Sequence, residues 1–161
     1  MKRALFLDRD GVINVDHGYV GTKERFEFVE GVLELILNAQ RRGYLPIIVT
    51  NQSAIARGYY GSEDFEKLTD WMLEKMQERG IVIDRSQVFH CPHGPDDGCK
   101  CRKPEPGMIL EAANRFGIDL ENSWMIGDKP SDIEAAKRAG VGHTHLCRRN
   151  EKIELKDLHG F

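Results

Sequence analysis

The chain of 161 residues is 40% hydrophobic and 30% charged, which is typical of one globular domain whose core needs no disulfide. Its formal net charge of −3 at pH 7 argues against non-specific binding to nucleic acid, which rests on lysine and arginine side chains that neutralise phosphates. Since no signal-peptide pattern precedes the first apolar run and no run approaches the ~18 residues of a membrane helix, we expect a cytoplasmic protein that binds neither nucleic acid nor membrane.

The first predicted element is a strand at residues 4–7, a run of apolar side chains that ends at Asp8. A run this short, bounded by a turn signal, is typical of a strand buried on both faces of a parallel sheet. Asp10 follows two residues later, and side chains two apart on an extended segment point the same way. Both carboxylates are therefore expected to face one spot at the end of the strand, where open α/β sheets bind ligands. Solvated turn aspartates are the alternative at this point.

Helices and strands are predicted to alternate along the rest of the chain. A loop of about twenty residues comes first, and loops of that length in compact domains are often binding elements. Apolar side chains at helical spacing, terminal glycines and Ser62 as an expected N-cap indicate the helices. Helices are expected at residues 31–43, 62–79, 106–116 and 130–140, and further strands at residues 45–49, 87–90, within 123–128, and at 143–146. This alternation predicts an α/β fold with a doubly wound parallel sheet, in a single domain over residues 1–161.

Three of the predicted strands end in polar side chains at what should be one edge of the sheet. These side chains are Asp8 and Asp10, Thr50 and Asn51, and Asp128 with Lys129. Acids that converge from two strands form an oxygen-rich site suited to Mg²⁺, which keeps waters and phosphate oxygens as its other ligands. Such a site beside lysines and a hydroxyl is suited to phosphoryl transfer, which depends on positioning and charge neutralisation. Neither a P-loop nor a GxGxxG motif is present, so nucleotide binding is not supported.

A cysteine and histidine cluster lies in a loop at residues 91–101. Its candidate ligands are Cys91, His93, Cys99 and Cys101, a C-x-H…C-x-C set of the kind that binds Zn²⁺ in closed tetrahedral sites. Four such ligands leave no open position for water, so the expected ion is structural. Arg102 and Lys103 follow directly, so zinc would aim Lys103 without touching a substrate. Reduced cysteines packed as small apolar residues are the alternative, and an iron–sulfur centre is disfavoured because a histidine replaces one thiolate.

Four motifs in chain order resemble those of the haloacid dehalogenase (HAD) superfamily. They are DRDGV after the first strand, TNQ after the second, RKP at residues 102–104 and GDKPSD at residues 127–132. The likeness covers about residues 3–147, and with the cysteine cluster it extends to two sister groups, the D-glycero-D-manno-heptose 1,7-bisphosphate 7-phosphatases and the histidinol-phosphate phosphatases. The runs NVDHGYV and TNQSAIARG are similar to the heptose group. The short span between His93 and Cys99 is more similar to the histidinol group.

The resemblance implies a HAD-like Rossmannoid fold without a separate cap domain, and a set of catalytic residues. Asp8 would be the nucleophile that forms an aspartyl-phosphate, and Asp10 would protonate the leaving oxygen and then activate water. Mg²⁺ would be held by Asp8, the main-chain carbonyl of Asp10 and Asp128. Thr50 and Lys103 would hold the phosphoryl oxygens.

The resemblance also implies contacts to the rest of the substrate. Arg102 would help to recognise it, as part of the catalytic set. Asp132 is expected to cap a helix or to steady Lys103 rather than to bind metal. Further candidate substrate contacts, for several of which a solvated surface or a plain salt bridge is the alternative, are Asp16, His17, Gly18, Tyr19, Asn51, Gln52, Ser53, Arg57, Arg102, Lys103 and Lys129.

The favoured function is a Mg²⁺-dependent phosphatase that removes the 7-phosphate of D-glycero-D-manno-heptose 1,7-bisphosphate. A histidinol-phosphate phosphatase is the first alternative, and a catalytically silent, zinc-bearing binding module is an alternative of another class. The expected cofactors are catalytic Mg²⁺ and structural Zn²⁺. The expected partner is a small sugar phosphate, and the protein is expected to be a monomer. The enzymatic interpretation requires that the carboxylates of Asp8 and Asp128 lie close enough to share one ion.

Overall fold

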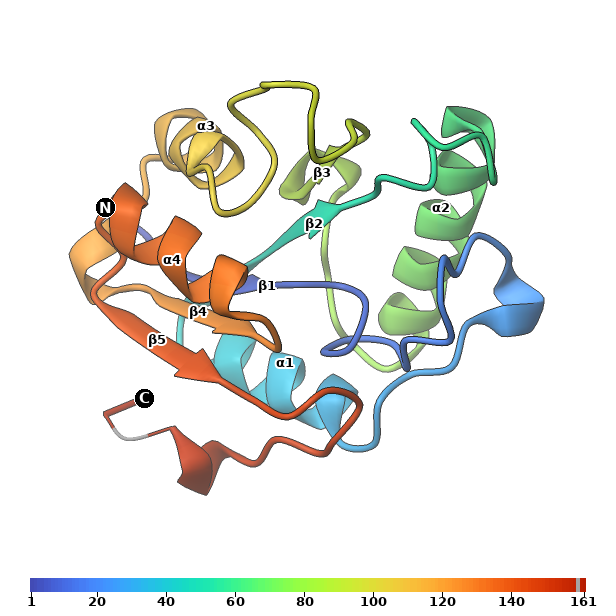
Figure 1. Cartoon of the computed structure of the whole chain (residues 1–161). Coiled ribbons are helices and arrows are strands. Elements are labelled where there is room, and N and C mark those ends of the chain that lie inside the picture. Colours follow the sequence, from blue (N-terminus) through green and yellow to red (C-terminus); the bar gives the residue numbers. More distant parts are fainter. Residues whose placement is uncertain (159) are drawn as a thin grey trace.

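The computed structural model describes residues 1–158 and 160–161 of the chain. In this part of the chain a five-stranded sheet has the strand order β3-β2-β1-β4-β5 (Figure 1). Its strands are β1 (Arg3–Leu7), β2 (Tyr44–Asn51), β3 (Val88–Cys91), β4 (Trp124–Gly127) and β5 (His143–Leu146). Every neighbouring pair is parallel, which confirms the predicted α/β fold with its doubly wound sheet.

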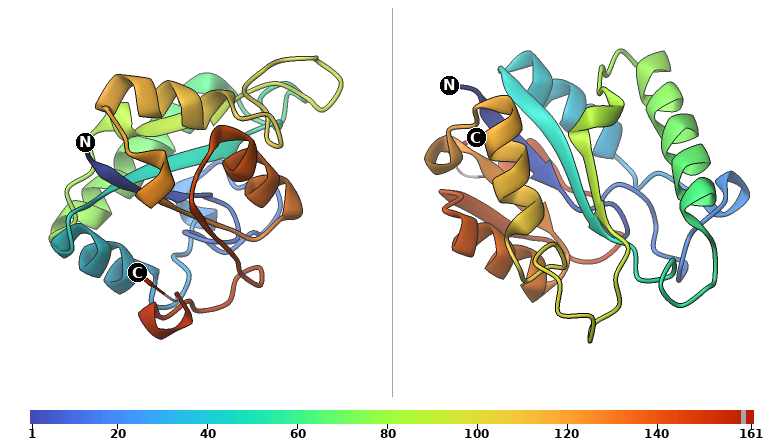
Figure 2. Two further views of the ribbon diagram at one scale, coloured as in Figure 1. Left: turned by 90° about the vertical axis from the view of Figure 1, so that its left-hand side faces the viewer. Right: turned by 90° about the horizontal axis from the view of Figure 1, so that it is seen from above.

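Four α-helices in the described residues cover the two faces of the sheet (Figure 2). They are α1 (Val32–Arg41), α2 (Ser62–Glu78), α3 (Gly107–Phe116) and α4 (Pro130–Ala139). The core on one face joins Leu5 of β1 to α1 and α2, and the core on the other face joins Phe6 to α3 and α4. Successive strand side chains point to opposite faces, so a strand between two helical layers must be apolar throughout. None of these helices combines the length and the apolar sequence that a membrane crossing requires.

Helix α2 begins one residue away from the predicted cap. Gly61, not Ser62, is the N-cap residue, and Ser62 is the first residue of the helix. The Asp64 carboxylate accepts a hydrogen bond of 2.9 Å from the backbone N–H of Gly61. This acid in the first turn also lies favourably at the positive end of the helix dipole, so the helix does not depend on the serine hydroxyl.

Strand β1 lies at the point where the strand order reverses. From β1 the chain first builds outward through β2 and β3, and later through β4 and β5 on the other side. Leu7 of β1 pairs with Ile126 of β4, and the next backbone N–H, that of Asp8, donates to the Ile126 carbonyl at 3.2 Å. The residues that follow β1 and β4 are therefore neighbours at the place where doubly wound sheets bind ligands.

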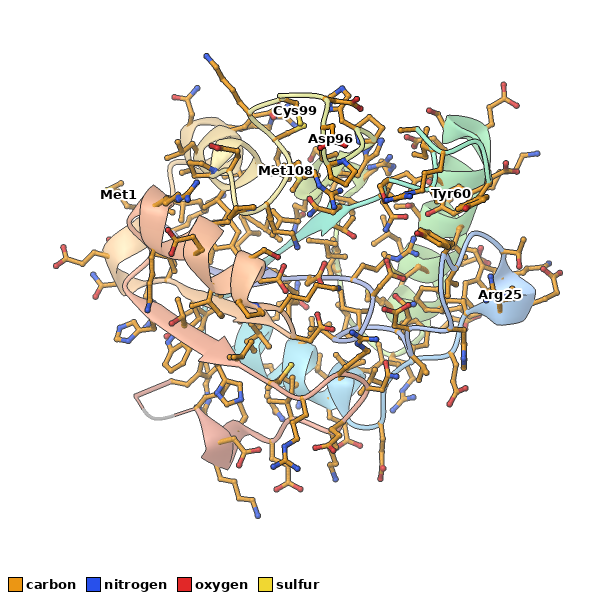
Figure 3. All side chains as sticks on the ribbon, in the orientation of Figure 1. Met1, Arg25, Tyr60, Asp96, Cys99 and Met108 are labelled. Carbon is orange, nitrogen blue, oxygen red and sulfur yellow. The ribbon has the colours of Figure 1, made fainter. Side chains whose placement is uncertain are left out.

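The C-terminal segment, for which the sequence patterns predict no element, fastens the long loop between β1 and α1. The backbone N–H of Asn150 donates to the carbonyl of Gly11 at 2.9 Å. The Asn150 side-chain oxygen accepts from the backbone N–H of Asp16 at 2.7 Å. Farther along this loop, Arg25 lies at its outer tip, away from the sheet (Figure 3). The inner part of the loop is thus held against the edge of the sheet while the outer part projects.

Candidate active site and metal centres

A cavity of about 690 Å³ opens at the carboxyl ends of the central strands. Its wall contains most of the residues that the sequence singles out, namely Asp8, Asp10, Asp16, Gly18, Tyr19, Asn51, Gln52, Ser53, Cys99, Arg102, Lys103 and Lys129. Seven others lie outside this wall: His17, Thr50, Arg57, Asp128 and three of the candidate zinc ligands, Cys91, His93 and Cys101. Loops after β1, β2 and β3 and the start of α4 all contribute, because parallel strands deliver their connections to the same edge.

Lys103 is the charged centre of the cavity floor. Its ammonium contacts Asp8 Oδ1 at 2.9 Å, Asp132 Oδ1 at 2.6 Å and the carbonyl of Val49 at 2.8 Å. The lysine is only 3% exposed, so these three acceptors match the three N–H donors of an ammonium that water does not reach. Burial lowers the pKa of Lys103, but the carboxylates of Asp8 and Asp132 raise it by more, so the pKa lies above its usual value. The lysine therefore stays charged beside Asp8.

The backbone of Lys103 is held separately, by the side chain of Asn51 at the end of β2. The Asn51 amide oxygen accepts from the Lys103 backbone N–H at 3.0 Å, and its NH₂ group donates to the Lys103 carbonyl at 3.2 Å. One side-chain amide thus pairs with both backbone polar groups of one residue, as a neighbouring strand would. Both ends of the Lys103 side chain are fixed by the sheet, which makes the ammonium a rigid element of the site.

Asp132 has the position that the sequence analysis expects. Its Oδ2 accepts a hydrogen bond of 3.1 Å from the backbone N–H of Lys129 at the start of α4, and its Oδ1 receives the Lys103 ammonium. The side chain lies against Gly127, where a Cβ atom would come within 2.2 Å of Asp132 Cβ. Asp132 therefore both caps the helix and steadies the lysine.

Asp128 is a buried carboxylate without hydrogen-bond partners. Both of its side-chain oxygens are buried and unpaired, although Lys129 Nζ and Arg149 Nε lie 3.7 and 3.6 Å away. A Cβ at Gly11 would lie 2.3 Å from Asp128 Oδ2, so only glycine leaves room for this carboxylate. Unpaired buried carboxylate oxygens are costly, and a cation is the partner that would satisfy them.

One oxygen from each of Asp8, Asp128 and Asp132 lies within 4.8 Å of the others, a grouping that could hold a metal ion. Both oxygens of Asp132 hold other groups, the Lys103 ammonium and the Lys129 backbone N–H, whereas the contacts of Asp8 all go to its Oδ1. Asp8 and Asp128 are therefore the two acids with an oxygen left for a cation. Hard oxygen ligands of this kind suit Mg²⁺, which often binds through one or two carboxylates. The condition that Asp8 and Asp128 lie close enough to share an ion is met.

The protonation of Asp8 shows the same need for a cation. Burial raises the pKa of Asp8, the Lys103 ammonium lowers it and the Asp132 carboxylate raises it again, with a result of about 7. One lysine shared between two acids does not keep Asp8 fully ionised near neutral pH. A divalent cation beside Asp8 would favour its charged form.

Asp10 has different surroundings, composed of hydrogen-bond donors. Arg9 Nη2 and Asn14 Nδ2 donate to Asp10 Oδ1 at 2.9 and 3.0 Å, and Gln52 Nε2 donates to Asp10 Oδ2 at 3.0 Å. Burial raises the pKa of Asp10, but the Arg9 charge and these hydrogen bonds outweigh it and hold the pKa below its usual range. The carboxylate does not belong to the acidic metal grouping.

The cysteine and histidine cluster forms a second candidate metal centre above the end of β2 (Figure 3). Cys91 Sγ lies 3.5 Å from Cys99 Sγ and 3.3 Å from His93 Nδ1, which is 3.3 Å from Cys101 Sγ. Tetrahedral zinc ligands with Zn–S bonds near 2.3 Å lie about 3.8 Å apart, and none of these cysteines forms a disulfide. The four side chains could hold Zn²⁺.

The thiols of this cluster do not titrate independently. Burial raises the pKa of Cys91, and the neighbouring thiols raise it further. Burial also raises that of Cys99, but the backbone N–H of Arg102 and the two other thiols lower it to about 7. The Cys99 thiol thus loses its proton more readily than an ordinary thiol, and a bound cation would also favour deprotonation of Cys91 and Cys101.

The loop at residues 16–19 brings some of its candidates to the cavity and not others. Asp16, Gly18 and Tyr19 line it. His17 instead pairs with Glu27 at 3.5 Å. The Arg25 guanidinium donates to the carbonyls of His17 and Tyr19 at 2.7 and 3.1 Å, which fixes this loop from outside.

Two further candidates from the second motif lie near the cavity rim or behind it. The Arg57 guanidinium lies 5.9 Å from the centre of the Tyr19 ring, and its Nε donates to Ser53 Oγ at 3.4 Å. Thr50 is fully buried, and its hydroxyl accepts from Gln52 Nε2 at 2.9 Å. Arg57 therefore packs against the loop at residues 16–19, and Thr50 is linked to the cavity through its hydrogen bond with Gln52.

The cavity wall also contains residues that the sequence analysis did not single out. Among them are Tyr60, Gly94, Pro95, Gly98, Glu105 and Ser131. Ser131 belongs to the GDKPSD motif and could have been found there. Tyr60 has no local signal, because its role depends on a contact with Gln52 across the turn of the loop after β2.

Comparison with known proteins gives consistent matches over nearly the whole chain. A family described as HAD-hydrolase-like matches residues 100–149. The Vibrio cholerae protein named D-glycero-beta-D-manno-heptose-1,7-bisphosphate 7-phosphatase is 48% identical over 159 residues, which cover 94% of this chain and 84% of that protein. A Campylobacter jejuni protein named for the alpha anomer is 49% identical over 150 residues, covering 93% of this chain and 85% of that protein.

A solved structure agrees with these relatives. The D,D-heptose 1,7-bisphosphate phosphatase of B. bronchiseptica, complexed with magnesium and phosphate, superposes with a TM-score of 0.81 at 38% identity. The match covers 89% of this chain and 79% of that one.

Proposed function

Because the chain belongs to the D-glycero-D-manno-heptose-1,7-bisphosphate 7-phosphatase family of HAD-like hydrolases, we propose that it removes the 7-phosphate of such a heptose bisphosphate through an aspartyl-phosphate on Asp8. The observation that carries the proposal is the meeting of Asp8, Asp128 and Lys103 at the point where the strand order reverses. An acid that attacks phosphorus, an acid left free for a cation and a fixed ammonium are the parts that phosphoryl transfer requires.

The reaction has two steps, and each balances in atoms and protons. In the first, an Asp8 oxygen bonds to phosphorus while the bond from phosphorus to the C7 oxygen breaks. Asp10, which must carry a proton for this step although its neighbours lower its pKa, gives that proton to the leaving oxygen. In the second, a water oxygen bonds to phosphorus, its proton passes to Asp10, and the Asp8–phosphorus bond breaks. Inorganic phosphate leaves, and both aspartates return to their starting states.

Mg²⁺ is the cofactor of this site. Asp8, Asp128 and the main-chain carbonyl of Asp10 would hold it, and the two unpaired oxygens of Asp128 support this assignment. When bound, it neutralises charge on the transferring phosphoryl group. The B. bronchiseptica relative contains magnesium and phosphate, which supports the same choice here.

Fixed cations would orient the substrate around Asp8. Lys103 would steady Asp8 and face a phosphoryl oxygen, while Lys129 beside Asp128 would meet the same phosphate. Ser53 and the amides of Asn51 and Gln52 extend this side of the cavity. Thr50 would contribute indirectly, through its hydrogen bond with Gln52.

The far end of the substrate would lie between the loop at residues 16–19 and Arg102. Arg102 lines the cavity and donates to the carbonyl of His93 at 3.4 Å, which directs its charge along the cysteine loop. A heptose bisphosphate carries a second phosphate at C1, and a guanidinium is well suited to bind it. Asp16, Gly18 and Tyr19 present polar groups to the sugar hydroxyls between the two phosphates.

Zn²⁺ would be structural and would act through the backbone. Cys91, His93, Cys99 and Cys101 would be its four ligands, and a four-ligand set of this kind would leave no position for water. The last candidate ligand is followed directly by Arg102 and Lys103, so an ordered cluster would fix the backbone from which these two side chains extend. The ion would therefore position the phosphate-binding groups without contacting the substrate.

The test is a phosphate-release assay with Mg²⁺ on both anomers of the heptose bisphosphate, with histidinol phosphate for comparison. We expect release of one phosphate per molecule, with ³¹P NMR showing that the C7 phosphate is lost and the C1 phosphate is kept. A kcat/KM at least tenfold higher for histidinol phosphate would overturn the substrate assignment. Absence of turnover on every phosphate ester would favour the binding-module alternative, against which the intact acidic set argues.

A further inference from the structure

The side chain of Gln52 connects Tyr60 to Asp10 inside the cavity wall. Gln52 is 3% exposed, and its Nε2 donates both to Asp10 Oδ2 at 3.0 Å and to Thr50 Oγ1 at 2.9 Å. Its Oε1 accepts from the Tyr60 hydroxyl. The whole amide is therefore used: one N–H group faces Asp10, the other faces Thr50, and the oxygen faces Tyr60.

The side chains that contact Asp10 offer no acceptor for a proton on its carboxyl group. Arg9, Asn14 and Gln52 all donate to this carboxylate, and none of these contacts offers it an acceptor. Oδ1 receives two of the donors and Oδ2 receives one, so Oδ2 has more capacity for a proton. Gln52 thus holds the oxygen that would pass a proton to the leaving group.

A side-chain amide can lie in two orientations, and only one of them supports this arrangement. If Gln52 turned over, its oxygen would face Asp10 and would accept the proton that Asp10 needs to give away. The turned amide would also leave the Tyr60 hydroxyl proton without its acceptor. Burial raises the pKa of Tyr60 to about 12, although the nearby Arg9 lowers it, so the hydroxyl keeps its proton and acts as a donor.

The Tyr60 ring is fixed independently of its hydroxyl. It packs against the backbone at Gly21, where an added Cβ would lie 2.5 Å from a ring carbon. The loop between β1 and α1 thus presses on the ring, and Tyr60 lies close to the start of α2 (Figure 3). Removal of the hydroxyl alone should leave the ring in place.

We propose that Tyr60 is a positioning residue for acid catalysis: its hydroxyl holds the Gln52 amide in the orientation that presents Nε2 to Asp10, so that Asp10 directs its proton to the leaving oxygen. This inference rests on the proposed phosphatase function. It concerns how the leaving group departs and does not depend on which sugar carries the phosphate.

The test compares two leaving groups in the variant Tyr60→Phe. The C7 oxygen of the heptose needs a proton to leave, whereas the nitrophenolate of p-nitrophenyl phosphate leaves without one. General acid catalysis contributes about 10²–10⁴-fold, so partial loss of alignment should lower kcat/KM for the heptose bisphosphate about tenfold and that for p-nitrophenyl phosphate less than about twofold. The parameter kcat/KM reports the steps through leaving-group departure, so later hydrolysis of the aspartyl-phosphate does not mask the effect.

Tyr59→Phe is the matched control. Tyr59 is adjacent in the chain and 63% exposed, and its ring contacts Tyr19 rather than the amide of Gln52. We expect this variant to have the wild-type kcat/KM on both substrates. Equal losses on both substrates in Tyr60→Phe would indicate a merely structural role and overturn the inference, as would no loss on either.

A second variant, Gln52→Ala, tests the route through the amide and serves if Tyr60→Phe does not fold. It should show the same selective loss, and adding Tyr60→Phe to it should cause no further loss, because two residues that act through one contact are not additive. Additive losses would overturn the inference. Failure of the wild-type chain to hydrolyse the heptose bisphosphate would instead overturn the proposed function itself, so the two failures are distinguishable.

Discussion

The crevice around Asp8 and the loop at residues 91–101 achieve order in opposite ways. In the crevice, the side chains of Lys103 and Asp132 are 2% and 1% exposed, and their partners come from strands and a helix. In the loop, most side chains are exposed or half-buried, and its internal backbone bonding is sparse, as in the 3.3 Å bond from Asp97 to Gly94. The crevice is ordered by burial and charge, whereas we propose that a bound ion orders the loop.

The two regions meet at one short segment. The last cysteine ligand precedes Arg102 and Lys103, and the Asn51 amide holds the Lys103 backbone from the sheet side. Cys91 itself pairs with Asn51 in the register of β2 and β3. The comparison therefore teaches that the lysine has two independent supports, and the experiments below separate them.

The largest effect is expected at the nucleophile. Asp8→Asn removes the attacking oxygen and keeps the shape, so phosphate release should fall by about 10⁴-fold or more. Lys103 retains Asp132 as its partner, so folding and zinc content should stay close to wild type. Phosphate release, thermal unfolding and metal content are the measurements. Activity within tenfold of wild type would exclude the covalent route.

Removal of the buried ammonium tests whether charge and burial order the crevice. Lys103→Met leaves Asp8 and Asp132 facing each other without their shared cation, and breaking a buried ion pair costs about 3–5 kcal/mol of unfolding free energy. Urea unfolding with Mg²⁺ absent measures this loss. Arg115→Met, which breaks an exposed pair with Glu111, is the control and should cost less than about 1 kcal/mol. Equal losses would mean that burial does not govern the crevice.

Removal of the zinc site tests the other support. Cys99→Ser should abolish stoichiometric zinc and lower kcat/KM about tenfold, less than the ~10²-fold that a displaced catalytic group can cost, because Asn51, Asp8 and Asp132 still hold Lys103. Cys147→Ser, outside the cluster, is the matched control and should retain zinc and activity. The assay contains excess Mg²⁺, so that only zinc differs. Full activity without zinc would refute the positioning role.

The smallest effect is expected within the loop itself. Asp97→Ala removes the side-chain acceptor of the Gly94 N–H, an exposed hydrogen bond of 2.6 Å. With zinc bound, the metal fixes this loop, so kcat/KM should change less than about twofold, in line with the ~1 kcal/mol of a single exposed hydrogen bond. Zinc affinity, measured by competition with a chelator, should fall only slightly. A loss as large as that of Cys99→Ser would show that the loop is ordered by its own hydrogen bonds.

Much of the fold could be predicted because its signals are local. Strand β1 is an unbroken apolar run since it is buried on both faces, and a reader of the sequence sees this directly. The glycines that end α3 and α4 adopt a left-handed conformation that other residues avoid, so they mark those ends. The cap of α2 was predicted one residue late, because serine and a following acid both signal a helix start.

The two groups of candidate metal ligands could be found in the sequence for a related reason. The candidate zinc ligands lie within eleven residues of one another, and Asp8 and Asp128 each follow an apolar strand. A site that depends on residue type and on spacing along the chain can be recognised from the sequence. The pKa of Asp10 could not be predicted in this way. It is lowered by Arg9, Asn14 and Gln52, and only the folded structure shows which groups surround the carboxylate.

By itself, the sequence determined the alternation of strands and helices, the acids at the strand ends and the four cysteine-loop ligands, since each depends on residues close together in the chain. Only the tertiary structure decided that Tyr60 meets Gln52, that Asn51 holds Lys103 and that Asn150 fastens Gly11 and Asp16. The last two contacts join residues far apart in the chain, and the first depends on how a loop turns. Hydrogen bonds between such groups depend on where the packed core places them, and that placement leaves no periodicity or motif to read.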